Sequence, residues 1–270
     1  MTLETQTIEF RNLGLLDWDA AAREQERIAD ARARGECPDT VLFVEHEPVY
    51  TCGLRFRPEN FRLSYDPSQP TYCGIPVRRA YRGGELTYHG PGQLVVYPIL
   101  RLPHGGQHLR RLIDFYQTLI IEVLGELGIA AFTCPDAIGV WTDRGKIASI
   151  GVGLRRGVTR NGFAINVATD PRAFEPILAC GRSEPMANIN DFHLEYGGLT
   201  PPCFRAEVGS GMLEVGKSKA VSSHRTPKNK AASSRRSPER ISIDEVRALV
   251  EKHFIVLSRA WLPTREDASP

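Results

Sequence analysis

The chain has 270 residues, of which 41% are hydrophobic and 24% charged, and its formal net charge is +2. This composition is that of an ordinary soluble protein, and the length allows one large domain or two small ones. Charged residues interrupt every apolar stretch before it reaches membrane-spanning length, and the N-terminus lacks the pattern of a signal peptide, so we expect a cytoplasmic protein with no membrane partner.

The N-terminal part of the chain predicts a helix and two buried strands. Asp17 is a suitable capping residue for a helix that runs to Arg34 and is stopped by Gly35. Residues 41–44 and 94–100 are short apolar runs, which are typical of strands buried on both faces.

The middle of the chain alternates helical and strand patterns. Apolar residues at three- and four-residue steps predict an amphipathic helix over 109–127. The β-rich runs 146–154 and 158–167 predict a hairpin. Asp170, followed by a proline, predicts a short helix that continues to about Ile177. This mixture favours a mixed α/β (α+β) fold over a doubly wound sheet.

The composition changes after residue 207. Residues 208–240 hold eight basic and two acidic residues, a net charge of +6, so the rest of the chain is −4. With almost no large apolar residues, this segment predicts a basic disordered linker. No aromatic residue lies among its charges, so we expect no nucleic-acid partner. Ser242 and Glu245 predict a capping box for a helix within 241–270, which we expect to dock on the main domain, formed by residues 1–207.

The segment from Arg82 to Gln93 is the most informative part of the sequence. Its glycines, next to a strand, mark a place where the backbone bends sharply or approaches a ligand. A tight turn would explain the glycines alone, but Arg82, Thr87 and His89 supply polar groups that a turn does not need. The segment resembles the signature of the octanoyltransferase, or lipoyl(octanoyl) transferase, family: Arg-Gly-Gly-x-x-Thr-aromatic-His-x-x-Gly-Gln-x-x-x-Tyr. Every fixed position is filled, out to Tyr97.

Lysine usage singles out Lys146 without any family comparison. It is the only lysine among residues 1–216, where every other Lys or Arg is arginine. Lysine is a compact charge with a tunable pKa, so a chain biased toward arginine has reason to keep one where chemistry needs it. Chance survival of a surface lysine is the alternative. The run from Lys146 to Gly151 also resembles the lysine-containing segment of the same family.

Cys180 is the cysteine that we select as the candidate nucleophile. It follows the short helix expected after Asp170 and precedes Gly181, a helix-to-loop junction where a thiol can be presented to a ligand. The cysteines form no Cys-x-x-Cys pair and lie near no histidine at zinc-ligand spacing, so we expect no metal. We interpret the others as structural, buried thiols: Cys37, Cys52, Cys73, Cys134 and Cys203.

The resemblance implies a catalytic domain like those of biotin and lipoate protein ligases, with a mixed sheet flanked by helices. It implies Cys180 and Lys146 as catalytic residues, although the usual proline before the cysteine is Ala179 here, and a frequent histidine is Asn161. We expect His89 to be a hydrogen-bonded core histidine rather than a proton donor. The implied substrate contacts are Arg82, Gly83, Gly84, Glu85, Leu86, Thr87, Tyr88, His89, Ser149, Ile150, Gly151, Gly162, Phe163 and Ala164.

The reaction that the resemblance implies is acyl transfer in two steps. Cys180 would take the octanoyl group from an acyl carrier protein, and the ε-amine of a lysine on a lipoyl domain would then take it from Cys180. The acceptors would be lipoyl domains of 2-oxo acid dehydrogenases and the glycine cleavage H protein, with no cofactor. Alternatives are lipoyl transfer between lipoyl domains, an ATP-dependent lipoate–protein ligase, and a non-catalytic carrier-protein binding module. We further predict a carrier-docking patch at Arg78, Arg79, Arg155, Arg156 and Arg160.

Overall fold

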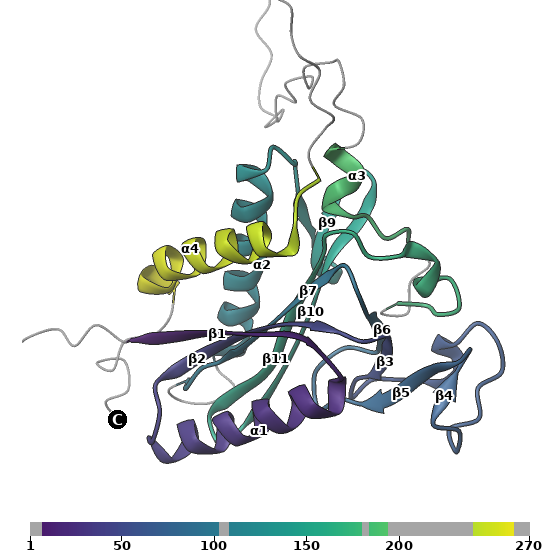
Figure 1. The fold of residues 1–270 in the computed structure, drawn as a ribbon, viewed down its shortest axis with the longest axis horizontal. Coiled ribbons are helices and arrows are strands. Elements are labelled where there is room, and N and C mark those ends of the chain that lie inside the picture. The colour runs from purple at the N-terminus through teal and green to yellow at the C-terminus, as the bar shows by residue number, and fades with distance from the viewer. Residues whose placement is uncertain (1–6, 103–107, 180–183, 194–239, 262–270) are drawn as a thin grey trace, which may run out of the picture.

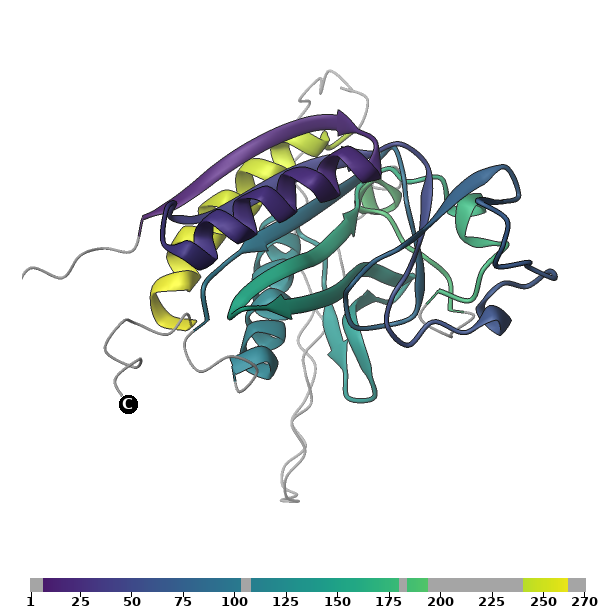
Figure 2. The same ribbon diagram turned by 90° about the horizontal axis from the view of Figure 1, so that it is seen from below.

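The computed structural model describes residues 7–102, 108–179, 184–193 and 240–261. In these residues a large mixed sheet has helices on both faces, and a small sheet lies beside it near the start of α1 (Figures 1 and 2). The large sheet has, in spatial order, β1 (Ile8–Leu16), β2 (Asp39–His46), β7 (Gln93–Ile99), β11 (Val158–Asn166), β10 (Gly145–Arg155), β9 (Ala137–Thr142) and β8 (Phe132–Cys134). The small sheet has β4 (Thr71–Tyr72), β5 (Ile75–Arg79), β3 (Val49–Cys52) and β6 (Leu86–His89).

One face of the large sheet is covered by α1 (Trp18–Arg34). The helix begins and ends as predicted: the Asp17 side chain accepts a hydrogen bond from the Ala20 N–H at 2.9 Å, and Gly35 ends it with a φ of 79°. Its buried side, which includes Ala21 and Ile28, packs on alternate residues of β2, β7 and β11. Alternation along these strands leaves the other residues to the opposite face.

The opposite face is covered by α2 (Leu109–Glu126), and α4 (Ile243–Trp261) crosses α2 (Figure 1). Ser242 and Glu245 form the predicted capping box of α4. Phe254 is fully buried, with its ring centroid 5.1 Å from that of Phe115 and 6.0 Å from that of Phe10. The last described helix thus belongs to the core under the large sheet, while most of the expected linker lies outside the described residues.

The helix expected from Asp170 to about Ile177 is shorter than predicted. Asp170 caps it as expected, but only the 3-10 turn η3 (Pro171–Phe174) forms. Pro176 has no N–H with which to continue the helix. Its carbonyl accepts from the Arg62 N–H instead, and Ile177 forms a bridge with Phe61. Other short helices within the described residues are η1 (Pro58–Asn60) and α3 (Ile189–His193). No helix in the described part of the chain is long and apolar enough to cross a membrane.

Because Phe254 anchors α4 in the core, we expect Phe254→Ala to lower the free energy of unfolding by about 3–5 kcal/mol through lost contacts and the cavity left behind. Val256→Ala, on the same helix at a residue that is 62% exposed, should change it by less than about 0.5 kcal/mol. Urea unfolding of both variants measures the difference. Equal effects would show that α4 does not contribute to the core in solution.

Candidate active site

A pocket of about 450 Å³, counting its open mouth, lies between the large and small sheets. Its floor consists of residues that pair across β7, β11 and β10: Ala164 lies between Val95 and Ser149, and Gly162 lies opposite Gly151. These side chains are small or absent, so the floor leaves room where larger residues would fill the space.

Arg82 closes one side of this pocket with a fully engaged side chain. Its guanidinium donates to the carbonyl and the hydroxyl of Thr51, both at 2.8 Å, and to the carbonyls of Gly83 at 3.0 Å and Glu85 at 3.3 Å. A Cβ at Gly151 would lie 2.8 Å from the Arg82 Cδ, so only glycine allows this approach. Arg82 therefore holds the backbone of the signature loop against β10.

Strand alternation in β6 divides the signature residues between two environments. Thr87 and His89 line the pocket, whereas Leu86 and Tyr88 pack in a separate apolar cluster with Tyr50. Of the predicted substrate contacts, the structure brings around the pocket Arg82, Gly84, Thr87, His89, Ser149, Ile150, Gly151, Gly162, Phe163 and Ala164. Four predicted contacts are not among the residues that line the pocket: Gly83, Glu85, Leu86 and Tyr88. Successive residues of a strand cannot all face one side.

Other lining residues were not predicted as contacts: Trp18, Thr51, Val95, Tyr97 and Asn161. Trp18 begins α1 and Thr51 lies on β3, so no local pattern connects either residue with the signature. Tyr97 was the exception, because it is the last fixed position of the signature and could have been added on that ground.

Two buried histidines lie behind the pocket, and hydrogen bonds define their tautomers. The Nδ1 of His46 lies 3.1 Å from the Leu16 carbonyl, which can only accept, so Nδ1 carries the proton. Burial lowers the pKa of His46 to about 4, so the ring is neutral near pH 7 and its Nε2 accepts from the Tyr97 hydroxyl at 2.8 Å. The hydroxyl of Tyr97, a residue that lines the pocket, thereby keeps its oxygen lone pairs for another donor.

His89 is fixed in the same way by a chain of side-chain amides. Asn166 donates to the Ala187 carbonyl at 3.2 Å and accepts from Gln93 at 2.9 Å, so the Gln93 oxygen faces His89 Nδ1 at 2.7 Å. His89 is thus the hydrogen-bonded core histidine that we predicted. Burial, with a smaller contribution from His46, lowers its pKa to about 3, which makes it neutral and leaves its Nε2 as an acceptor.

Lys146 does not line the pocket but is buried on β10, the strand that also carries the lining residues Ser149 and Gly151. Its Nζ lies 5.0 Å from the centre of the Trp141 ring and donates to the Ile138 carbonyl at 3.4 Å. Its backbone pairs with the segment that follows residue 183: the Lys146 N–H donates to the Pro185 carbonyl, and the Ala187 N–H donates to the Lys146 carbonyl. The interpretation of Lys146 as a chance surface lysine is wrong, because 4% of it is exposed.

Cys180 lies outside the described residues, but the segment before it is described. Residues 177–179 are not helical, so the expected helix-to-loop junction at Cys180 is wrong. The Leu178 N–H instead donates to the Asn60 carbonyl at 2.7 Å, and the Asn60 amide donates to the carboxylate of Glu85 at 2.7 Å. The signature residue Glu85 is thereby connected to the chain that leads to Cys180.

The other cysteines only partly fit the expectation of buried thiols. Cys52 is buried, and burial raises its pKa to about 11, which makes it a poor nucleophile. Cys37 and Cys134 are half-buried, and Cys73 is exposed on a tight turn, which corrects that expectation. Cys203 lies outside the described residues. Within the described ranges, no cluster of His, Cys, Asp or Glu could hold a metal ion.

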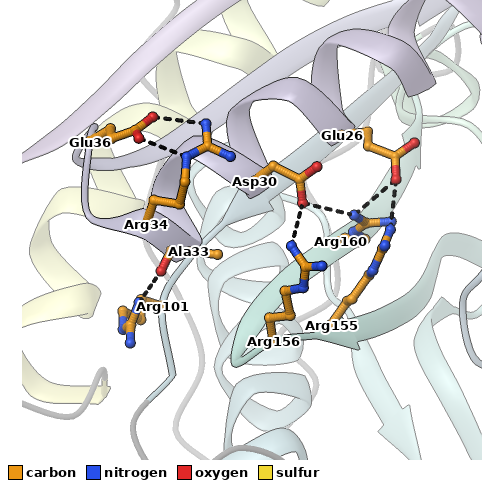
Figure 3. Close-up of polar contacts among 9 residues, drawn as sticks. All are labelled: Glu26, Asp30, Ala33, Arg34, Glu36, Arg101, Arg155, Arg156 and Arg160. Atoms are coloured by element: carbon orange, nitrogen blue, oxygen red, sulfur yellow. Dashed lines mark hydrogen bonds and ion pairs between the residues drawn. The ribbon is translucent and has the colours of Figure 1, made fainter.

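The arginines expected to form a docking patch are mostly paired with acids of α1. Arg155 and Arg160 contact Glu26 at 2.8 and 3.2 Å, and Arg156 lies 3.9 Å from Asp30 (Figure 3). Arg78 likewise pairs with Asp19 at 2.8 Å, whereas Arg79 is exposed. The surface beside α1 is therefore an ion-pair network with a small positive excess rather than a purely basic patch.

Comparison with known proteins defines the class of this fold and site. Residues 19–196 match the family described as the lipoyl protein ligase A/B catalytic domain. In structure, the chain is similar to a bipartite lipoate protein ligase from Thermoplasma acidophilum, with a TM-score of 0.58 and 18% identity over 94% of this chain and 85% of that one. A lipoate-protein ligase A bound with ATP gives a TM-score of 0.57 at 16% identity, over 93% and 85%. The predicted lipoate-ligase-like fold is confirmed.

Similar sequences narrow the class further. An octanoyltransferase of Pelobacter propionicus is 46% identical over 181 residues, which are 67% of this chain and 82% of the relative. An octanoyltransferase of Geotalea uraniireducens is 43% identical over 187 residues, 69% and 82% of the two chains. The chain belongs to the lipoyl protein ligase A/B catalytic domain family, and within it the chain is an acyltransferase.

The depressed histidine pKa values predict how stability depends on pH. The folded-state pKa of His89, about 3, lies below the ordinary value of 6.5, so between these values the unfolded chain binds more protons. The free energy of unfolding should therefore fall as the pH drops below 6.5, and His89 alone should contribute a loss of about 2 kcal/mol between pH 7 and 5. The glutamine of His89→Gln cannot be protonated. The free energy of unfolding of this variant, measured in urea at the two pH values, should therefore fall by about 2 kcal/mol less than that of the parent. An unchanged pH dependence would mean that His89 is not buried and neutral.

Proposed function

We propose that this acyltransferase moves an octanoyl group from an acyl carrier protein to the ε-amine of a lysine on a lipoyl domain, through a thioester on Cys180. The observation that carries the proposal is the pocket between the two sheets. Its floor of small residues, among them Gly162 and Ala164, with the apolar Val95 beside them, suits an unbranched apolar chain. Ten of the fourteen substrate contacts that the resemblance to octanoyltransferases implies are among the residues that surround it.

Cys180 and Lys146 would divide the chemistry between them. The Lys146 ammonium favours the Cys180 thiolate, which attacks the thioester carbonyl. The C–S bond to the carrier breaks, and the carrier thiol leaves with a proton from Lys146. The neutral amine of the acceptor lysine then attacks the acyl-enzyme, Lys146 takes back a proton from this amine, and the thiolate is regenerated. Because an amide is more stable than a thioester, the second step runs downhill without ATP.

The relatives favour this reaction over its rivals. An ATP-dependent ligase activates its acid as an adenylate and needs no nucleophilic cysteine, and the sequences with 40% identity or more that we compared are named octanoyltransferases. Transfer between lipoyl domains uses the same thioester and differs only in its donor. A binding module without catalysis would have no reason to bury a lone lysine such as Lys146 beside the pocket.

The acyl-enzyme can be tested directly. Incubation with octanoyl-acyl carrier protein should add one octanoyl group to the intact protein by mass spectrometry, and Cys180→Ser should abolish the adduct. Cys134→Ser, at a half-buried cysteine away from the signature, is the matched control and should keep it. An adduct that survives in Cys180→Ser would place the nucleophile elsewhere. Formation of the adduct only from an octanoylated lipoyl domain would make the protein a transferase between lipoyl domains.

The arginines beside α1 predict a second test, of how the enzyme meets an acidic carrier. Outside residues 208–240 the chain carries −4, so encounter needs a local positive excess. Arg155→Glu with Arg156→Glu should raise the KM for the carrier. Glu26→Gln with Asp30→Asn neutralises the acids that pair with these two arginines. This double variant should lower the KM for the carrier, because less negative charge then lies beside the arginines.

Steady-state kinetics at low and high salt measures both effects, which should shrink as salt screens the charges. Deletion of residues 209–236 should leave the KM nearly unchanged. If the deletion raises the KM while both charge variants behave like the parent, the basic segment recruits the carrier and the arginines do not.

A further inference from the structure

The side chain of Lys146 ends in a slot whose walls come from β9. The slot is defined by Trp141, Gly139 and the carbonyl of Ile138, all on that strand. Lys146 and Trp141 lie directly opposite each other in the β9–β10 pair, and each is 4% exposed. This register places the lysine ammonium over the indole ring, 5.0 Å from its centre, while the Ile138 carbonyl accepts from the same Nζ at 3.4 Å.

Gly139 provides the space for this ammonium. A Cβ at this position would lie 2.7 Å from the Lys146 Cε and 3.2 Å from its Nζ, and also 2.7 Å from the Ala148 carbonyl oxygen. The peptide is held in place because the buried Gln117 side chain donates to the Gly139 carbonyl at 3.0 Å. The absence of a side chain at Gly139 therefore leaves room for the end of Lys146, and a hydrogen bond from α2 holds this backbone in place.

The Trp141 side chain is also held in place by a hydrogen bond. The indole Nε1 donates to the carboxylate of Glu184 at 2.7 Å. Glu184 immediately precedes Pro185, whose carbonyl accepts from the Lys146 backbone N–H at 2.9 Å. The ring that covers the ammonium and the backbone that carries the lysine are thus connected through the same short segment. An indole face attracts a cation more strongly than the face of phenylalanine does.

We propose that Trp141 is a positioning residue that, with Gly139, holds the Lys146 ammonium at one place for acyl transfer. The inference rests on the proposed function for the role of Lys146, and on the geometry alone for the slot. It also gives a reason for a lysine at this position of an arginine-rich chain, because lysine carries a compact charge whereas arginine carries a broad planar guanidinium, and the end of Lys146 lies against the bare backbone of Gly139. Trp141 does not touch the substrate in this scheme and acts only through Lys146.

The slot can be tested without any assay of activity. In protein labelled with carbon-13 at lysine Cε, the ring current of Trp141 should shift the Lys146 resonance away from those of Lys217, Lys219, Lys228, Lys230 and Lys252, and Lys146→Arg assigns it by its disappearance. The shift should vanish in Trp141→Leu and persist in part in Trp141→Phe. A Lys146 resonance that Trp141→Leu leaves unmoved would overturn the proposal.

Kinetics then tests whether the slot matters for catalysis. Trp141→Leu should lower kcat by roughly tenfold or more with little change in the KM for the carrier, since a displacement of about 1 Å can cost 100-fold. The kcat of Trp141→Phe should lie closer to that of the parent. Trp261→Leu changes a tryptophan on α4 and should have the kcat of the parent. The kcat of Lys146→Arg should fall at least as far as that of Trp141→Leu.

The outcomes separate the two proposals. A parent-like kcat in Trp141→Leu, in which the resonance has lost its shift, would overturn the positioning role. A parent-like kcat in Lys146→Arg would refute the catalytic role of Lys146 in the proposed function, and with it the positioning role. The measured resonance shift would still show whether Trp141 and Gly139 form the slot.

Discussion

The contact between the Arg82 loop and the bare backbone of β10 is the constraint on which the rest of the site depends. The Gly83 N–H donates to the Val152 carbonyl at 2.9 Å, and Arg82 packs where Gly151 has no side chain. This approach joins the small sheet to the large one. With larger residues on β10 the sheets would separate, and the pocket between them would lose its wall. The glycines of β10 and β11 are thus required for packing before they serve any ligand.

The polar groups behind the pocket are arranged so that burial does not leave them unsatisfied. His46 and His89 are neutral because burial disfavours their charged forms, and each donates from Nδ1 to an oxygen that can only accept. The chain of hydrogen bonds from His89 through Gln93 and Asn166 ends on the carbonyl of Ala187. The N–H of the same Ala187 donates to the Lys146 carbonyl. The wall of the pocket and the support of the lysine therefore share one hydrogen-bonded framework.

The conformations of Lys146 and of the arginines show why residue type alone does not define a role. Lys146 is buried in a slot made by β9, where its charge is met by an indole face and a carbonyl. Arg155 and Arg156, equally prominent in the sequence, lie on the surface and pair with acids of α1 (Figure 3). Lys146 therefore differs from these arginines in its burial, whereas an exposed ion pair on the surface contributes little to stability.

The sequence alone determined several of the elements and the family. Asp17 and Gly35 bounded α1, the hairpin of β10 and β11 followed from its two β-rich runs, and the signature from Arg82 to Tyr97 indicated the lipoate-ligase-like fold, because these are local patterns. Only the tertiary structure decided which signature residues face the pocket, since the direction of each side chain depends on how β6 pairs. It also brought Trp18 and Thr51 to the pocket from distant segments. It ended η3 before Ile177, because contacts across the fold compete with local helix formation.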